Sequence, residues 1–172
     1  MTRLKQWLVW LSRIHRCRGF GIQSPTDYAF VRYVVNEHWP YYAYDELHEA
    51  DRIREKKGRL YFRLSNWRQP SLMQADDYRK WWQAGCRTMR FADHLEHVEL
   101  TYLDIEESVG YEQLLACCDE HSVLVVDNIC HNWERWHAIE RDNRTGTTFD
   151  LYYCGIVFMD TQRYKHNYQI NF

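Results

Sequence analysis

The polar residues best placed to do chemistry follow two apolar, strand-like segments of the sequence. Asp104 follows residues 98–103, and Asp127 and Asn128 follow residues 123–126. A segment of helical character separates the two strands, so strand, helix and strand form one βαβ unit with parallel strands. The carboxyl ends of such strands lie at one edge of the sheet, where α/β proteins place their ligands. We therefore expect Asp104, Asp127 and Asn128 to lie close together at that edge.

Charge is unevenly distributed along a chain that is nearly neutral overall. The 172 residues carry 22 Lys and Arg against 24 Asp and Glu, a net charge of -2, which argues against coating nucleic acid through the overall field. Between residues 91 and 134 there are many carboxylates and no Lys or Arg inside the range. If Asp104 and Asp127 meet, they repel unless a metal ion, a proton or the basic N-terminal arm, residues 13–18, compensates them.

The N-terminal segment combines positive charge with an apolar helical face. Its cations all precede the first acidic residue, Asp27, and are Arg3, Lys5, Arg13, Arg16 and Arg18. Its apolar side chains recur at helical spacing and form the N-terminal apolar stripe: Leu4, Trp7, Leu8, Leu11 and Ile14. We expect this stripe to pack on the domain's own core or on a partner subunit. A basic helix with Trp on its apolar face also suits an anionic membrane surface, whereas the apolar run is too short for a signal peptide or a transmembrane segment.

The hydrophobic period changes near residue 85, from helical patterns to strand patterns. Helices are predicted at 25–38, 45–57 (ended by Gly58), 60–67, 75–83, 108–118 and 133–141. Strands are predicted at 88–91, 98–103, 123–126, 147–153, 155–159 and 168–172, the last two as an antiparallel hairpin. We predict one α/β domain over residues 1–172, with a mainly helical part (1–85) and a truncated Rossmann-like mixed sheet (86–172) made of the βαβ unit and the C-terminal hairpin.

The sequence lacks the glycine-rich turn with which Rossmann-like proteins hold a cofactor. Such a turn follows a strand, and its closely spaced glycines let the backbone approach the ligand at a helix N-terminus. Of the 7 glycines only Gly19 and Gly21 are closely spaced, and no strand pattern precedes them. The segment between Pro70 and Val98 is also shorter than the about 30 residues of one βαβ unit. We therefore expect no bound cofactor.

Several stretches at both ends of the chain carry a family resemblance. They are Arg18–Pro25, Gly58–Trp67, Ser122–Asn128 and Phe149–Phe158. Together they resemble class I S-adenosylmethionine-dependent methyltransferase-like proteins of Bacteroidetes. In that family the first stretch reads His-Gly-Ile-His-Ser-Pro-Phe, so Phe20, Gln23 and Thr26 depart from it. The glycine-rich turn that follows the second stretch in the family is missing here, so the resemblance implies a shortened form without the cofactor-binding half.

The part that remains is similar to the metal site of catechol-type O-methyltransferases. There, an Asp from one strand end and an Asp-Asn pair from the next bind magnesium. The resemblance implies Asp104, Asp127 and Asn128 as metal ligands, and all three offer the hard oxygen donors that magnesium requires. The alternative is structural, because an Asp that ends a buried strand commonly caps the following helix.

These observations favour a degenerate, non-catalytic methyltransferase-like protein that acts as an interaction or oligomerisation module. The 6 cysteines lack CxxC spacing, which indicates reduced thiols and a cytoplasmic location. The resemblance implies a bacterial protein, and a truncated sheet, whose edge and apolar faces must be covered, favours a homo-oligomer. An unknown protein partner remains open, and no nucleic acid partner or transmembrane segment is expected. One alternative is a magnesium-assisted O-methyltransferase, which alone would use S-adenosylmethionine and Mg²⁺. The other is a nucleic-acid or membrane-surface adaptor that acts through the basic N-terminal helix.

Overall fold

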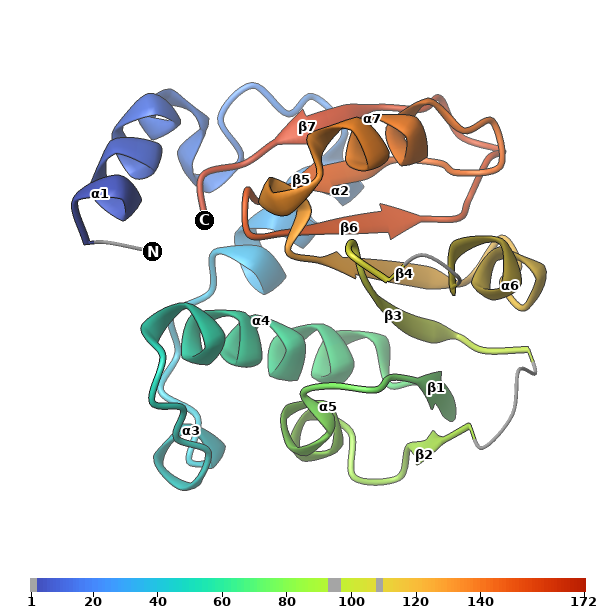
Figure 1. Cartoon of the computed structure of the whole chain (residues 1–172), viewed down its shortest axis with the longest axis horizontal. Helices are drawn as coiled ribbons and strands as arrows, with labels where there is room; N and C mark the ends of the chain where they lie inside the picture. The colour runs from blue at the N-terminus through green and yellow to red at the C-terminus, as the bar shows by residue number, and fades with distance from the viewer. Residues whose placement is uncertain (1–2, 93–96, 108–109) are drawn as a thin grey trace.

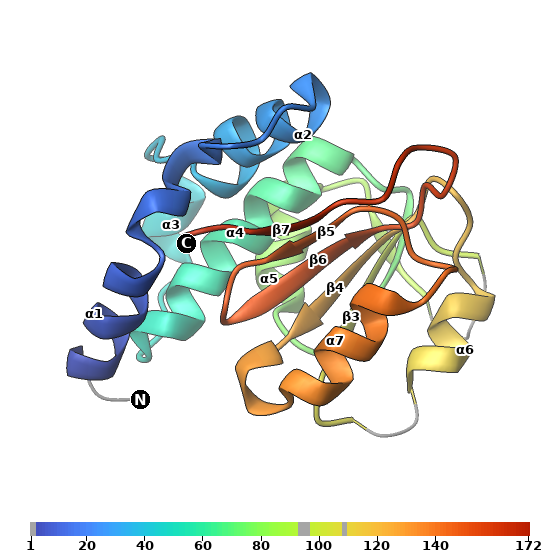
Figure 2. The same cartoon turned by 90° about the horizontal axis from the view of Figure 1, so that it is seen from above.

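A mixed sheet with helices on both faces forms the fold (Figures 1 and 2). The computed structural model describes residues 3–92, 97–107 and 110–172. In these residues the sheet has seven strands in the order β2-β1-β3-β4-β6-β5-β7. The strands are β1 (Leu72–Gln74), β2 (Arg90–Phe91), β3 (Leu100–Asp104), β4 (Val123–Asp127), β5 (Thr148–Asp150), β6 (Cys154–Phe158) and β7 (Asn167–Gln169).

The helices divide between the two faces of the sheet. They are α1 (Arg3–Ser12), α2 (Pro25–Phe30), α3 (Ala43–Glu46), α4 (Arg52–Arg68), α5 (Arg79–Gly85), α6 (Gly110–Ala116) and α7 (Trp133–Arg141), with short 3-10 helices η1 (Ile14–Gly19) and η3 (Ile129–His131) and a π-helix η2 (Val31–Val35). Figure 2 shows α4 and α5 on one face and α6 and α7 on the other. A separate apolar core fills each side, as expected for a sheet that is covered twice.

The central strand is β4, as its unbroken run of β-branched and apolar residues predicts. All five of its residues are buried, which is typical of a strand covered on both faces. It pairs in parallel with β3 and antiparallel with β6, and α6 connects β3 to β4. The predicted βαβ unit and the truncated Rossmann-like α/β class are therefore confirmed.

Helix α4 corrects the prediction that Gly58 ends a helix. The helices predicted at 45–57 and 60–67 are one continuous helix, which begins after Asp51 and ends at Gln69. Asp51 Oδ1 accepts hydrogen bonds from the backbone N–H groups of Ile53 and Arg54 at 2.8 and 2.9 Å, a standard N-cap. Gly58 is needed for close packing, because a Cβ there would lie 2.4 Å from a ring atom of Trp81.

The C-terminal strands also pair differently from the prediction. The antiparallel hairpin joins β5 to β6 across a tight turn at Tyr152, which has a left-handed φ of 72°. Strand β7 instead pairs in parallel with the other side of β5, so the hairpin predicted for 155–159 and 168–172 was wrong. Strand β1 was missed, in the part predicted as mainly helical, because its three residues are too few to show a period.

The N-terminal apolar stripe does not pack on the domain's own core. Its exposed fractions are 68% for Leu4, 57% for Trp7, 53% for Leu8, 36% for Leu11 and 47% for Ile14. Helix α1 lies at the periphery beside the C-terminus (Figure 1). Of the two expected positions of the stripe, this exposure contradicts packing on the domain's own core, and packing on a partner subunit stays a prediction.

We expect Gly58→Ala to lower the free energy of unfolding by about 1–3 kcal/mol, the usual effect of overpacking a core. This loss outweighs the gain of about 1 kcal/mol from the better helix propensity of Ala. Urea denaturation measures the difference. Asn66→Ala on the exposed face of the same helix is the matched control and should not destabilise. A Gly58→Ala variant as stable as the wild type would contradict the contact with Trp81.

Candidate functional site

The three residues predicted as metal ligands meet at the carboxyl edge of the sheet. Parallel pairing sets Asp104 of β3 opposite Asp127 of β4. Asn128 follows directly in a left-handed conformation with a φ of 55°. Its side-chain amide donates a hydrogen bond to Asp104 Oδ2 at 2.6 Å. The structure thus brings Asp104, Asp127 and Asn128 together, as the strand pattern predicts.

The cation between them is an internal lysine from α4. Lys57 Nζ lies 2.8 Å from Asp127 Oδ2 and 2.9 Å from Asn128 Oδ1. Lys57 is 4% exposed and Asp127 1% exposed, so the ion pair is shielded from water. A buried carboxylate needs such a partner, because an unpaired charge is costly in the interior. Lys57 was not among the expected sources of compensation, and the N-terminal arm, which was, places Arg13 against Asp150 at 2.8 Å instead.

Two tyrosines complete the environment of Asp127. Tyr61 donates its hydroxyl to Oδ1 at 2.8 Å, and Tyr102 donates to Oδ2 at 3.0 Å. Burial, followed by the nearby negative charge of Asp127, raises the pKa of Tyr61 and that of Tyr102. Both phenols therefore stay protonated and act as donors at neutral pH. With the Lys57 ammonium, they give both oxygens of the Asp127 carboxylate internal partners.

The remaining carboxylate, Asp104, takes part in the turn that follows β3. Its Oδ1 accepts the backbone N–H of Glu106 at 2.9 Å, while its Oδ2 binds Asn128. The contact with Glu106 closes a turn at residues 105 and 106, before α6 begins at Gly110, so the helix-capping alternative also stays a prediction. Within 3–92, 97–107 and 110–172, no group of three or more His, Cys, Asp or Glu could hold a metal ion. Metal ligation by Asp104, Asp127 and Asn128 stays a prediction, and it would require a metal to displace the Lys57 ammonium.

The switch point of the sheet lies beside this cluster. The chain leaves β1 for α5 on one face and leaves β3 for α6 on the other (Figure 2), and α/β folds bind ligands where connections diverge in this way. The turn after β1 contains Asp77 and Tyr78 and no glycine. Tyr78 is 4% exposed, and the Arg54 guanidinium lies 4.4 Å from its ring centre. Side chains thus fill the place where a glycine-rich turn would offer bare backbone.

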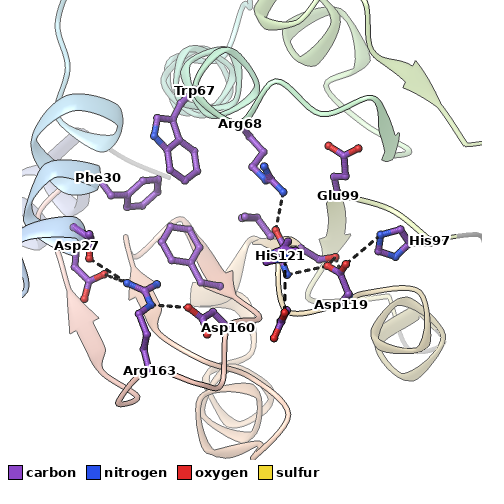
Figure 3. A pocket seen from close by; sticks show the side chains of 15 residues that line it. Asp27, Phe30, Trp67, Arg68, His97, Glu99, Asp119, His121, Asp160 and Arg163 are labelled. Carbon is purple, nitrogen blue, oxygen red and sulfur yellow. Dashed lines mark hydrogen bonds and ion pairs between the residues drawn. The ribbon is translucent and has the colours of Figure 1, made fainter.

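A cavity of about 750 Å³ lies at the opposite edge of the sheet, where β4 begins (Figure 3). Its apolar wall is made of Phe30, Trp67 and Phe158. Some of its charged groups pair with one another: Arg163 with Asp160 at 2.7 Å and with Asp27 at 3.5 Å, and His97 with Asp119 at 3.3 Å. Its carboxylates outnumber its arginines, so the lining has no excess of positive charge that would select an anion.

Comparisons with protein-family models, with curated proteins and with solved structures found no match to this chain. In the part of the chain that the structure describes, no helix is long and apolar enough to cross a membrane. The functional assignment therefore depends on the geometry of the chain itself.

Sequence reasoning missed Lys57, although a signal for it exists. Lys57, Tyr61 and Leu64 recur at the spacing of one helix face. With Gly58 interpreted as a stop, Lys57 became the last residue of a charged, solvated helix. If the helix is instead continued through Gly58, the same residues place a lysine and a tyrosine on its buried face. Each of these side chains then requires a polar partner.

We expect Lys57→Met to lower the free energy of unfolding by about 3–5 kcal/mol, because it leaves the buried Asp127 charge uncompensated. Asp127→Asn should also destabilise, and the double variant should lose less than the sum of the two, which is the signature of a direct interaction. Urea denaturation of the four proteins at neutral pH measures this coupling. The neighbouring change Lys56→Met, which breaks no ion pair with a carboxylate, is the control. Equal losses in Lys57→Met and Lys56→Met would disprove the role of Lys57.

Proposed function

We propose that this chain is a methyltransferase-like protein without catalytic activity that acts as an interaction module through helix α1. The observation that carries the proposal is the exposure of the N-terminal apolar stripe, whose members are between 36% and 68% exposed. A contiguous apolar surface of this kind marks an interaction site. Trp side chains, such as Trp7 and Trp10 here, are also enriched in protein interfaces.

Hydrogen bonds hold the N-terminal segment in a defined position, so the exposed stripe is an ordered surface. Arg13 forms two hydrogen bonds with the carboxylate of Asp150, at 2.8 and 2.9 Å. Asn171 donates its side-chain amide to the Trp10 carbonyl at 3.2 Å, and its backbone N–H to the Arg16 carbonyl at 3.1 Å. These contacts fasten the N-terminal segment to the end of the chain and to β5, while the stripe stays exposed.

The closed carboxyl edge supports the absence of catalysis. Lys57, Tyr61 and Tyr102 use both oxygens of Asp127, and Tyr78 fills the turn at the switch point. A methyl-transfer site needs room for a cofactor and a substrate beside these strand ends. Lys57, Tyr61, Tyr102 and Asp127 are buried and satisfy one another, which is better explained as part of the core of the fold.

The partner we propose is a second copy of this chain. The charges before Asp27 are all positive, whereas the segment from residue 97 to residue 134 contains acidic residues and no Lys or Arg. Arg16 and Arg18 form no ion pair within the residues that the structure describes. Two copies can therefore join the cationic segment of one to the acidic segment of the other, and complementary charge of this kind guides association.

An anionic membrane surface is a second candidate, and a specific observation favours it. Trp7 and Trp10 are 57% and 44% exposed on a segment whose charges are all positive. Helices of this composition lie in the interface of anionic membranes, with their apolar face among the lipids.

We expect the wild type to sediment as a dimer or larger species and Leu8→Glu to sediment as a monomer. Leu8 is 53% exposed, so the variant should keep the wild-type melting temperature. Ser12→Glu adds the same charge to an exposed position of α1 outside the stripe, and it should associate like the wild type. Analytical ultracentrifugation over a range of concentrations measures all three.

A monomeric wild type at every concentration would overturn association with a second copy. Flotation with phosphatidylglycerol vesicles, compared with phosphatidylcholine vesicles, then tests the second candidate. Binding to the anionic vesicles alone, lost in Leu8→Glu, would establish the membrane surface as the partner.

A further inference from the structure

A second cavity, of about 440 Å³, lies between the N-terminal segment, the end of η2, the middle of α4 and the last residues of the chain. Its lining is strongly cationic and comprises Arg18, Lys56, Arg59 and Arg63, with Glu37 as its one acidic member. Glu37 accepts a hydrogen bond from Tyr41 at 2.7 Å. The cavity therefore holds more positive than negative charge, unlike the cavity of Figure 3, in which carboxylates outnumber arginines.

Two of these cations have no carboxylate partner in the described ranges. Lys56 Nζ lies 4.4 Å from the centre of the Phe172 ring, and no ion pair involves it. Burial, and to a smaller extent the charges of Arg52 and Arg63, lower the pKa of Lys56 to about 8. Arg63 is 7% exposed, and its guanidinium donates to the carbonyls of Val34 and Val35 at 2.7 and 2.9 Å. Like charges held side by side in this way are destabilising unless an anion joins them.

The same cavity contains buried donors without acceptors. Asn36 Nδ2 and Arg59 Nε are inaccessible to water and have no hydrogen-bond partner among the described residues. Both residues line the cavity. Buried polar groups are almost always hydrogen-bonded. Arg59 pairs with Glu55 through Nη2, but its Nε and the Asn36 amide lack an acceptor, and they lie beside cations that lack a carboxylate.

We propose that this cavity binds a phosphate monoester, held by Lys56, Arg59 and Asn36. A phosphate monoester carries up to two negative charges at neutral pH and offers three strong acceptor oxygens, which matches the excess charge and the free donors. Arg18 and Arg63 add positive charge around it. Trp10 and Phe172 also line the cavity and provide an apolar wall for the body of the ligand, and the volume is that of a small-molecule site.

Isothermal titration calorimetry with inorganic phosphate tests the site on the full chain. We expect saturable binding, which Lys56→Met weakens by about tenfold or more, because hydrogen bonds to charged groups are the strong ones. Without phosphate, Lys56→Met should melt no lower than the wild type, since it removes a charge that lacks an ion pair. Lys80→Met, at an exposed lysine of α5, is the matched control and should bind phosphate normally.

Asn36→Asp is a second, nearly isosteric variant. It replaces a donor with a carboxylate that can pair with the cations, so it should raise the melting temperature and abolish phosphate binding. Failure of phosphate to bind the wild type, or equal binding by the wild type, Lys56→Met and Asn36→Asp, would overturn the proposal. Leu8→Glu does not alter the cavity lining, so phosphate binding and self-association can fail separately.

Two further probes distinguish the source of the phosphate. Adenosine monophosphate carries the group on a free aromatic molecule, and phosphatidic acid in phosphatidylcholine vesicles carries it on a lipid headgroup. Tighter binding of one probe than of inorganic phosphate, lost in Lys56→Met, would identify that source. If neither probe binds more tightly, the ligand site is specific for the phosphate group alone.

Discussion

The buried ion pair between Lys57 and Asp127 is the constraint on which the rest of the structure depends. Asp127 ends the central strand, and a carboxylate in that position must find a cation within hydrogen-bonding distance. Helix α4 supplies this cation as Lys57. The helix must therefore cross the sheet at a point where Lys57 Nζ reaches the end of β4. Gly58, the next residue, lets the Trp81 indole approach the helix closely, which fixes α5 against α4. One electrostatic requirement thus determines the packing of two helices on the sheet.

Because Lys57 pairs with Asp127, the polar cluster at the carboxyl edge is separate from the surfaces that we propose for interaction. In many α/β proteins the carboxyl edge is the functional one, but here Lys57, Tyr61 and Tyr102 enclose it. The exposed apolar side chains and the cations without carboxylate partners on which the proposals depend lie instead around the N-terminal segment. Its outer side exposes the N-terminal apolar stripe, and its inner side contributes Trp10 and Arg18 to the cationic cavity. The two proposals therefore concern one region, which Arg13 fastens to β5 through Asp150.

The sequence predicts the parts of this account that depend on local pattern. The run from Val123 to Val126 predicts a buried central strand, and parallel pairing then predicts that Asp104 and Asp127 meet. The cation between them could not be predicted in the same way, because Gly58 resembles a helix stop unless the position of Trp81 is known. The pairing of β7 with β5 depends on contacts between distant segments. Periodicity within each strand carries no information about such contacts.

The Lys57 ammonium organises the carboxyl edge of this sheet through Asp127 and Asn128, and we propose that no cofactor or metal takes its place. Calorimetric titration of S-adenosylmethionine into the purified protein, with and without Mg²⁺, tests this proposal. The account predicts no heat beyond dilution and no change in melting temperature in either condition, because a ligand stabilises a protein only if it binds the native state. Saturable binding of S-adenosylmethionine, or stabilisation by Mg²⁺ that disappears in Asp127→Asn, would contradict it.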